Sequence, residues 1–288
     1  MTITTQENTM GKWTTEIRSR SGWFDIDLWE LWKYRDLILL FVRRDFVAVY
    51  KQTILGPIWF LVQPVFSTIV FTVVFGRIAQ IPTDGLPPVL FYMSGIVIWN
   101  YFAGCLTKTS DTFVSNAGIF GKVYFPRLTA PVATVISNLV TFTIQFSLFL
   151  TILTYFGLKG GVVKPNLWLL IIPLLLLQMA ALGLGFGILV SSLTTKYRDL
   201  TFLITFGTQL WMYATPIVYP MSQIPEKWQW VYALNPMAAV VEAFRYALLG
   251  AGAIRIWQLG ISLGITVLVL FIGIILFSRT EKTFMDTV

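Results

Sequence analysis

The sequence predicts an all-α polytopic membrane protein, and composition is the first reason. Hydrophobic residues make up 56% of the 288 residues and charged residues only 12%, whereas soluble domains average about 45–50% apolar and about 25% charged residues. The second reason is that apolar residues gather in six blocks without Asp, Glu, Lys or Arg, each long enough to cross a bilayer. We therefore expect one transmembrane domain, residues 27–288, after a polar cytoplasmic segment, residues 1–26.

The six charge-free blocks are the predicted transmembrane helices. A charge at the centre of a spanning helix costs about 2.5–3.5 kcal/mol even on lenient scales. The chain carries 21 Lys and Arg and 14 Asp and Glu residues, so six such blocks do not arise by chance. The predicted spans are residues 54–76, 85–107, 128–158, 165–195, 200–220 and 256–278. Gly183 and Gly187 have the GxxxG spacing that allows close helix packing, which is weak support for a dimer interface.

The distribution of Lys and Arg predicts the orientation of the chain. Fifteen of them fall in the N-terminal segment, the second and fourth loops and the C-terminal tail, and six fall in the other loops. Cytoplasmic loops carry the excess of positive charge, so we expect both termini in the cytoplasm. Residues 1–21 lack the apolar core of a signal peptide, so the first span is expected to direct insertion.

Residues 27–50 are predicted to form an amphipathic helix in the cytoplasmic interface of the membrane. Apolar residues recur there at helical spacing, while charged residues interrupt any spanning run. Asp27 followed by Glu30 resembles a capping box, and Trp29 and Trp32 suit the headgroup layer. A soluble helix packed on a partner protein is the alternative that the sequence leaves open.

The segment after the fifth span, residues 221–255, is too apolar for a water-exposed loop, but its charge-free pieces are too short to cross the membrane. We predict re-entrant helices on the outer side, broken at Asn235-Pro236. Glu242 and Arg245 stand three residues apart, and we expect them to pair with each other or across a dimer. The predicted outer gate comprises Trp228, Trp230, Asn235, Pro236, Glu242 and Arg245.

The chain lacks the residues that several kinds of transport and catalytic chemistry require. The predicted spans contain no carboxylate, Lys or Arg, which argues against proton-coupled transport. The chain has no His and no paired carboxylates, so we predict neither a metal site nor an enzyme. Residues 118–123 are the nearest match to a nucleotide-binding loop and have the wrong spacing. The basic residues lie between apolar blocks, so no nucleic-acid partner is expected. If the chain performs work, we expect the energy to come from another polypeptide; sodium sites built from carbonyls and hydroxyls are the alternative that the sequence leaves open.

Aromatic and polar side chains form stripes that suit a sugar conduit, because rings stack on sugars and hydroxyls hydrogen-bond to them. In the fifth span a narrow face at about 100° per residue carries Thr201, Thr205, Thr208, Met212, Thr215 and Tyr219. The first span contributes Trp59, Gln63 and Phe66, and the second contributes Tyr92 and Trp99. Ordinary helix packing and interfacial aromatic belts are the alternative explanation.

Three motifs carry a resemblance to a known family. They are Lys51-Gln52-Thr53-Ile54-Leu55-Gly56-Pro57-Ile58-Trp59 with Gln63-Pro64, then Tyr197-Arg198-Asp199-Leu200, and Asn235-Pro236-Met237 with Glu242-Ala243-Phe244-Arg245-Tyr246-Ala247-Leu248-Leu249-Gly250. The chain, from about Asp27 to its end, resembles the membrane subunits of bacterial polysaccharide ABC exporters. These are type-2 exporters of O-antigen, teichoic acid and related lipid-linked glycans.

The resemblance implies a homodimer of six-span subunits in the lipids of a bacterial cytoplasmic membrane, with two copies of a separate ABC ATPase. ATP and Mg would be bound by that ATPase, so no cofactor is expected in this chain. The glycan would pass through a channel between the subunits, which favours the conduit interpretation of the stripes. An exporter for drugs or small lipids, a passive channel and a membrane scaffold are the alternatives.

Two further sets of residues take their roles from the resemblance. The residues just before the first span lie where the pyrophosphate of a lipid-linked substrate would sit, although general lipid anchoring also explains them. These predicted headgroup residues are Arg43, Arg44 and Lys51. The second cytoplasmic loop, about residues 110–122, is expected to contact the ATPase. Its Asp111, Ser115 and Asn116 side chains are expected to cap a short helix there. The predicted coupling residues are Asp111, Ser115, Asn116, Arg198 and Asp199.

Overall fold

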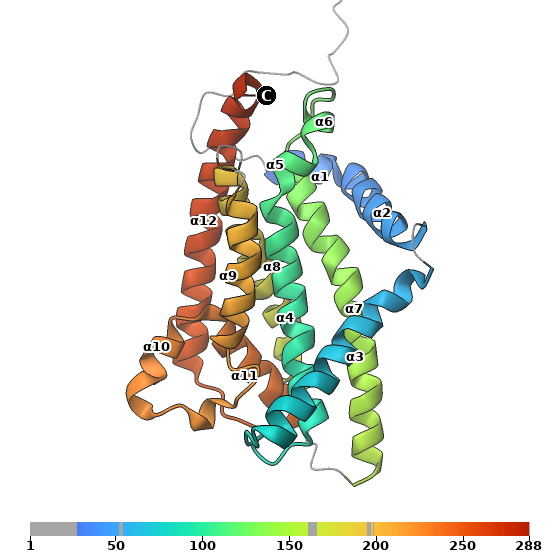
Figure 1. Ribbon diagram of the computed structural model, residues 1–288. Helices are drawn as coiled ribbons and strands as arrows, with labels where there is room; N and C mark the ends of the chain where they lie inside the picture. Colours follow the sequence, from blue (N-terminus) through green and yellow to red (C-terminus); the bar gives the residue numbers. More distant parts are fainter. Residues whose placement is uncertain (1–27, 52–53, 161–165, 195–196, 198, 288) are drawn as a thin grey trace, which may run out of the picture.

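The computed structural model describes residues 28–51, 54–160, 166–194, 197 and 199–287, and every regular element in them is a helix (Figure 1). The α-helices are α1 (Leu28–Lys33), α2 (Arg35–Lys51), α3 (Trp59–Phe71), α4 (Pro88–Ser110), α5 (Thr112–Ser115), α6 (Ala117–Phe120), α7 (Thr129–Leu158), α8 (Ile172–Thr194), α9 (Leu200–Tyr213), α10 (Gln229–Ala233), α11 (Pro236–Leu249) and α12 (Ile256–Thr287). Between them lie the 3-10 helices η1 (Gly56–Ile58), η3 (Leu167–Ile171), η4 (Met221–Gln223) and η5 (Glu226–Trp228) and the π-helix η2 (Thr72–Ile78). The predicted all-α class is confirmed.

Five stretches of helix are long and apolar enough to cross a membrane, so the chain is a polytopic membrane protein. They are Gly56–Ile78, Pro88–Ser110, Thr129–Leu158, Leu167–Thr194 and Ile256–Glu281, and they match the predicted first four spans and the sixth. The predicted fifth span differs, because α9 has only 14 residues and rises about 21 Å. Pro216 disfavours helical geometry at Thr215, so the chain leaves the helix after Tyr213.

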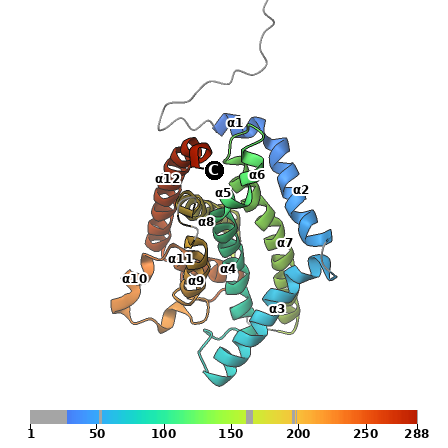
Figure 2. The same cartoon turned by 45° about the horizontal axis from the view of Figure 1, so that its top comes forward.

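The predicted interface helix is two helices, α1 and α2, that meet at Tyr34. In both views α2 runs beside α7 (Figures 1 and 2), and the two helices are in contact. Phe41 is buried in this contact, whereas Leu39 and Leu40 are exposed. Such a helix carries apolar residues on its free surface as well as on its packed one. Residues 1–26 and the capping box proposed for Asp27 and Glu30 lie outside the part whose side chains are described.

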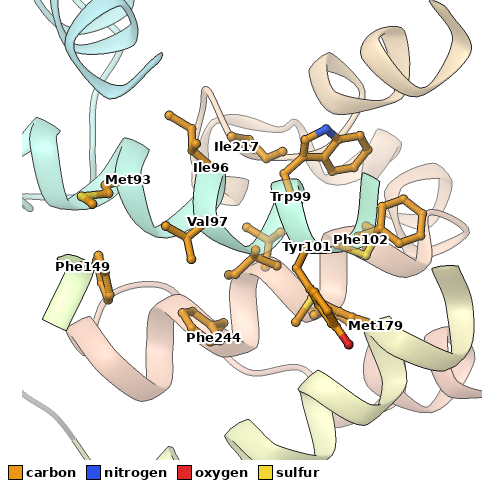
Figure 3. Packing of buried hydrophobic residues seen from close by; sticks show 14 of the residues in the cluster. Met93, Ile96, Val97, Trp99, Tyr101, Phe102, Phe149, Met179, Ile217 and Phe244 are labelled. Atoms are coloured by element: carbon orange, nitrogen blue, oxygen red, sulfur yellow. The ribbon is translucent and has the colours of Figure 1, made fainter. Parts of the chain in front are cut away.

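Helix α4 is the centre of the bundle, and α3, α7, α8, α9 and α11 all pack against it. Its side chains meet those of three other helices in one apolar core (Figure 3), where Val97 lies near Phe149 of α7 and Phe244 of α11, and Tyr101 lies near Met179 of α8. The second predicted span is therefore surrounded by protein rather than by lipid. Tyr92 and Trp99, the predicted conduit residues of this helix, lie in this buried environment.

The GxxxG pair of α8 packs within the chain and not at a surface. A Cβ added to Gly183 would lie 2.6 Å from Cys105 Cβ of α4, and one added to Gly187 would lie 2.5 Å from Thr109 Cβ. Two backbones can approach this closely only where a side chain is absent. The free thiol of Cys105 is buried in the same contact.

The two ends of the bundle carry different short helices. Helices α5 and α6 lie at the end where α12 finishes, and α10 lies at the opposite end (Figure 1). The predicted break at Asn235-Pro236 separates α10 from α11, as expected for an Asn that caps a helix with Pro in its first turn. Helix α11 is almost wholly buried, so its two charged residues lie inside the protein.

Candidate functional site

Arg245 of α11 is 2% exposed and donates hydrogen bonds to three backbone carbonyls. Two of them, Pro216 and Ile217, follow α9, and the third is Phe91 of α4. The guanidinium also lies 3.7 Å from the centre of the Phe91 ring. The carbonyls after α9 need such a donor, because the helix has ended and a buried acceptor without a partner is costly. Arg245 therefore holds the end of α9 against α4.

No ion pair or hydrogen bond joins Glu242 and Arg245 in the part of the structure that is described, although their charges interact electrostatically. Glu242 is 7% exposed and lies against the loop after α11, where a Cβ at Gly252 would collide with its carboxylate. The guanidinium is engaged by carbonyls of other elements, which a sequence spacing of three cannot reveal. A contact across a dimer stays a prediction.

Asn235 makes a second connection to the end of α9. Its side-chain oxygen accepts from Trp211 Nε1 at 3.0 Å and from the Met237 backbone N–H at 3.1 Å. Its amide nitrogen donates to the Ala214 carbonyl and to Thr215 Oγ1. The predicted gate residues Asn235 and Arg245 thus both bind residues 211–217. Pro236 is buried beside them, whereas Trp228 and Trp230 are exposed.

The predicted stripe of the fifth span is only partly accessible. Thr208 and Thr215 are buried, and each hydroxyl bonds back to a carbonyl four residues earlier. Thr201 and Met212 are half-buried and Thr205 is exposed. Tyr219 donates to the Tyr213 carbonyl at 3.1 Å and pairs with the hydroxyl of Tyr232 at 3.0 Å. The exposed side of α9 is a different one, carrying Phe202, Leu203, Phe206, Leu210 and Tyr213.

The other predicted conduit residues are also partly buried and partly exposed. Tyr92 and Trp99 are buried in the core around α4, where Trp99 packs against Trp211 and Phe102. Trp59, Gln63 and Phe66 of α3 are exposed. A substrate can reach Tyr92, Trp99, Thr208 or Thr215 only if the subunit rearranges. Both α3 and α9 carry exposed aromatic side chains, among them Phe66 and Phe202.

The predicted headgroup residues lie along α2 and its end. Arg43, Arg44 and Lys51 are exposed, and Arg44 forms an ion pair with Asp45 at 2.9 Å. Asp45 Oδ2 also accepts from Ser137 of α7. Sequence reasoning missed Lys108, which lies one residue beyond the predicted second span and donates to Asn138 of α7 at 3.1 Å. The bond between Asp45 and Ser137 joins α2 to α7, and the bond between Lys108 and Asn138 joins α4 to α7. Arg43 and Arg44 stay at the surface.

The loop between α4 and α7 contains α5 and α6, so the predicted short helix is present as two. The capping roles are wrong, because Asp111 and Asn116 precede these helices without accepting a hydrogen bond from them. Asn116 instead donates to the Thr112 carbonyl, and Ser115 donates to that of Asp111. Burial raises the pKa of the Asp111 carboxyl.

Of the two loop residues before α9, Asp199 directly precedes the helix without a side-chain cap and is exposed. Arg198 lies outside the described residues. Lys122, Val123 and Tyr124, which follow α6, are exposed.

A group of phenylalanines beneath α5 and α6, which we call the α2–α5–α12 aromatic cluster, was not predicted. Its rings are Phe41, Phe113, Phe120, Phe125 and Phe277. Phe113 stacks on Phe277 of α12 with ring centres 4.6 Å apart, and Phe41 of α2 meets Phe125 at 5.8 Å. Arg127 is bonded to Glu281 near the end of α12. The loop that carries α5 and α6 therefore shares one apolar core with α2 and α12.

Comparison with known proteins identifies the family. The family model described as ABC-2 type transporter matches residues 36–249, from α2 to the end of α11. The chain belongs to the ABC-2 type transporter family. This confirms the resemblance found in the sequence motifs, and it makes the chain a membrane permease subunit without a catalytic domain.

Named relatives of this ABC-2 permease come from several bacteria. The O-antigen export system permease protein RfbA of Klebsiella pneumoniae is 28% identical over 211 residues, 73% of this chain and 79% of the relative. The polysialic acid transport protein KpsM of Escherichia coli is 21% identical over 247 residues, 85% of this chain and 93% of the relative. The inner membrane transport permease YadH of Escherichia coli K12 is 25% identical over 213 residues, 71% of this chain and 78% of the relative.

Proposed function

We propose that this chain is the membrane subunit of an ATP-driven exporter that moves a lipid-linked polysaccharide, such as O-antigen or teichoic acid, across the bacterial cytoplasmic membrane. The observation that carries the proposal is the similarity, over most of the chain, to permeases named for export of O-antigen and transport of polysialic acid. The five apolar spans and the family match support a membrane transport subunit. We propose that such a subunit takes its energy from a separate ATPase.

The proposed topology has six spans, with both termini in the cytoplasm. Helix α9 and the non-helical residues 214–219 together form the fifth crossing, and α10 and α11 return into the outer half of the membrane. Non-helical backbone at membrane depth requires internal hydrogen-bond partners. Arg245 and Asn235 supply such partners to residues 214–217, which supports this topology.

The proposed assembly is a homodimer with two copies of a cytoplasmic ABC ATPase, which binds ATP and Mg. The loop with α5 and α6 is the proposed ATPase contact, because it joins two spans and shares the aromatic cluster with α2 and α12. The glycan is proposed to pass between the subunits along the exposed aromatic faces of α3 and α9. Arg43, Arg44 and Lys51 are proposed to attract the pyrophosphate of its lipid carrier.

The decisive experiment is reconstitution of the chain with the ABC ATPase expressed with it, in vesicles that contain a lipid-linked glycan. Glycan that becomes accessible to an added glycosidase in an ATP-dependent way supports the proposal. An ATPase variant that binds but does not hydrolyse ATP is the matched control. If the complex hydrolyses ATP faster with a drug or a small lipid and leaves the glycan in place, the alternative exporter class is correct.

A further inference from the structure

A small cavity lies between α11, the loop that follows it and the beginning of α12. Most of its lining is aliphatic, but three lining residues carry polar groups: Glu242 of α11, Arg255 of the connecting loop and Gln258 of α12. The space is about that of a single water molecule and is partly open to its surroundings. Water can therefore reach its polar lining.

The carboxamide of Gln258 is the first unexplained group. The residue is 4% exposed, and its Nε2 is buried without a hydrogen-bond partner among the described residues. Buried amide nitrogens are nearly always bonded, to protein or to ordered water. Gln178 of α8 shows the usual situation, since its Nε2 donates to Ser262 Oγ of α12 at 2.6 Å.

The carboxylate of Glu242 is the second group. Gly252 adopts φ +88°, and the absence of a side chain there lets the carboxylate lie against the loop backbone, where the N–H of Ala253 interacts with it. A carboxylate can accept about four hydrogen bonds, so this N–H leaves acceptor capacity that faces the cavity.

We propose that the cavity is a binding site for one water molecule, which accepts a hydrogen bond from Gln258 Nε2 and donates one to Glu242. A cation is disfavoured because Arg255 and the amide N–H groups of Gln258 line the same wall, and an anion is disfavoured by the carboxylate. A neutral molecule that both donates and accepts hydrogen bonds can bind the Gln258 amide and the Glu242 carboxylate at once, and water is such a molecule of the right size.

The water joins the middle of α11 to the first turns of α12. The N-terminal end of α11 is joined to α12 directly, because Ser262 Oγ donates to the Pro236 carbonyl at 2.7 Å. Near Glu242 the junction is instead made by a small molecule that can shift with either helix. The inference is independent of what the exporter carries, because it concerns only how α11 is fastened to the last span.

The sign of a stability change tests the proposal. With the water present, Gln258→Met removes a satisfied hydrogen bond and should lower the melting temperature of the purified full-length chain by about 2–4 °C. With a dry cavity the same change removes an unbonded buried amide and should raise it. Gln178→Met is the matched control, since it removes a direct hydrogen bond and should lower the melting temperature in either case.

Two further measurements make the test independent of one variant. The losses of stability caused by Glu242→Gln and by Gln258→Met should be non-additive in a double-mutant cycle, because both residues bind the same water. A cryo-electron microscopy map of the unmodified transporter that resolves waters should show density between the two side chains. Additive losses, an empty cavity in such a map, or a higher melting temperature for Gln258→Met would each overturn the proposal.

Discussion

Arg245 and Glu242 stand one turn apart on α11, yet they are directed to different parts of the protein. The guanidinium binds the Pro216 and Ile217 carbonyls at the end of α9, while the carboxylate lies against Gly252 in the loop to α12. Helix α11 therefore connects the end of α9 to the beginning of α12. The consequences of losing either charge differ accordingly.

Arg245→Met should destabilise the protein by at least about 2 kcal/mol, because each buried carbonyl left without a donor costs about 1–3 kcal/mol. Arg245→Lys should recover part of the loss, since an ammonium cannot reproduce the fork of donors. Thermal unfolding in detergent measures both, with exposed Arg77→Met as the control. The double reversal Glu242→Arg with Arg245→Glu should not restore stability, and a full recovery would show that the two residues do pair.

Asn235→Ala should cost about 1 kcal/mol for the lost helix cap and more for the lost bonds to Trp211 and the end of α9. Asn235→Asp keeps the acceptor for Trp211 and Met237 but removes the donor to Ala214 and Thr215, so an intermediate loss is expected. Unfolding followed by tryptophan fluorescence measures the series. Equal losses for the two variants would contradict the role assigned to the amide nitrogen.

Phe113→Leu should reduce glycan transported per ATP hydrolysed, because Phe113 stacks on Phe277 and joins the α5–α6 loop to α12. Binding of the ATPase should persist, since Phe113 is buried and not on the loop surface. Tyr155→Leu, which alters an exposed ring at the other end of α7, is the control. Unchanged transport per ATP with normal expression would show that the aromatic cluster only stabilises the fold.

Arg43→Gln and Lys51→Gln should each weaken the response of ATP hydrolysis to an anionic lipid-linked substrate. A basic residue near an anionic surface contributes about 1 kcal/mol, so half-maximal stimulation should need about fivefold more substrate. The effect should shrink at high ionic strength, and exposed Lys159→Gln is the control. Reduced membrane insertion with unchanged substrate response would favour general lipid anchoring.

Single cysteines placed along α9 and just after it test which side of this segment meets water. A polar thiol reagent should label positions 202, 206 and 213 during transport, because their side chains are exposed, and should spare positions 208 and 215, which are buried. Buried Cys105 provides the unlabelled background. Labelling of positions 208 and 215 together with protection of 202 and 206 would restore the hydroxyl stripe as the conduit.

The spans that the sequence predicted best are those whose signal is local. Absence of charge over about 20 residues reflects the cost of burying charge in lipid, and this alone located five of the helices. The helix in the fifth predicted span is shorter than its apolar stretch, because apolar composition continues past Thr215 while Pro216 ends the helix. The break at Asn235-Pro236 was also predictable, since the cap and the proline act within one turn.

The sequence by itself thus determined the membrane class, most of the helices and, through short motifs, the family. Only the tertiary structure decided the partners of polar groups. There, Arg245 binds carbonyls after α9 and on α4, Lys108 binds Asn138, and Tyr92 and Trp99 are buried in the core. Helical periodicity says which residues share a face but not what lies opposite that face. That depends on how helices far apart in the chain pack together, which no local pattern records.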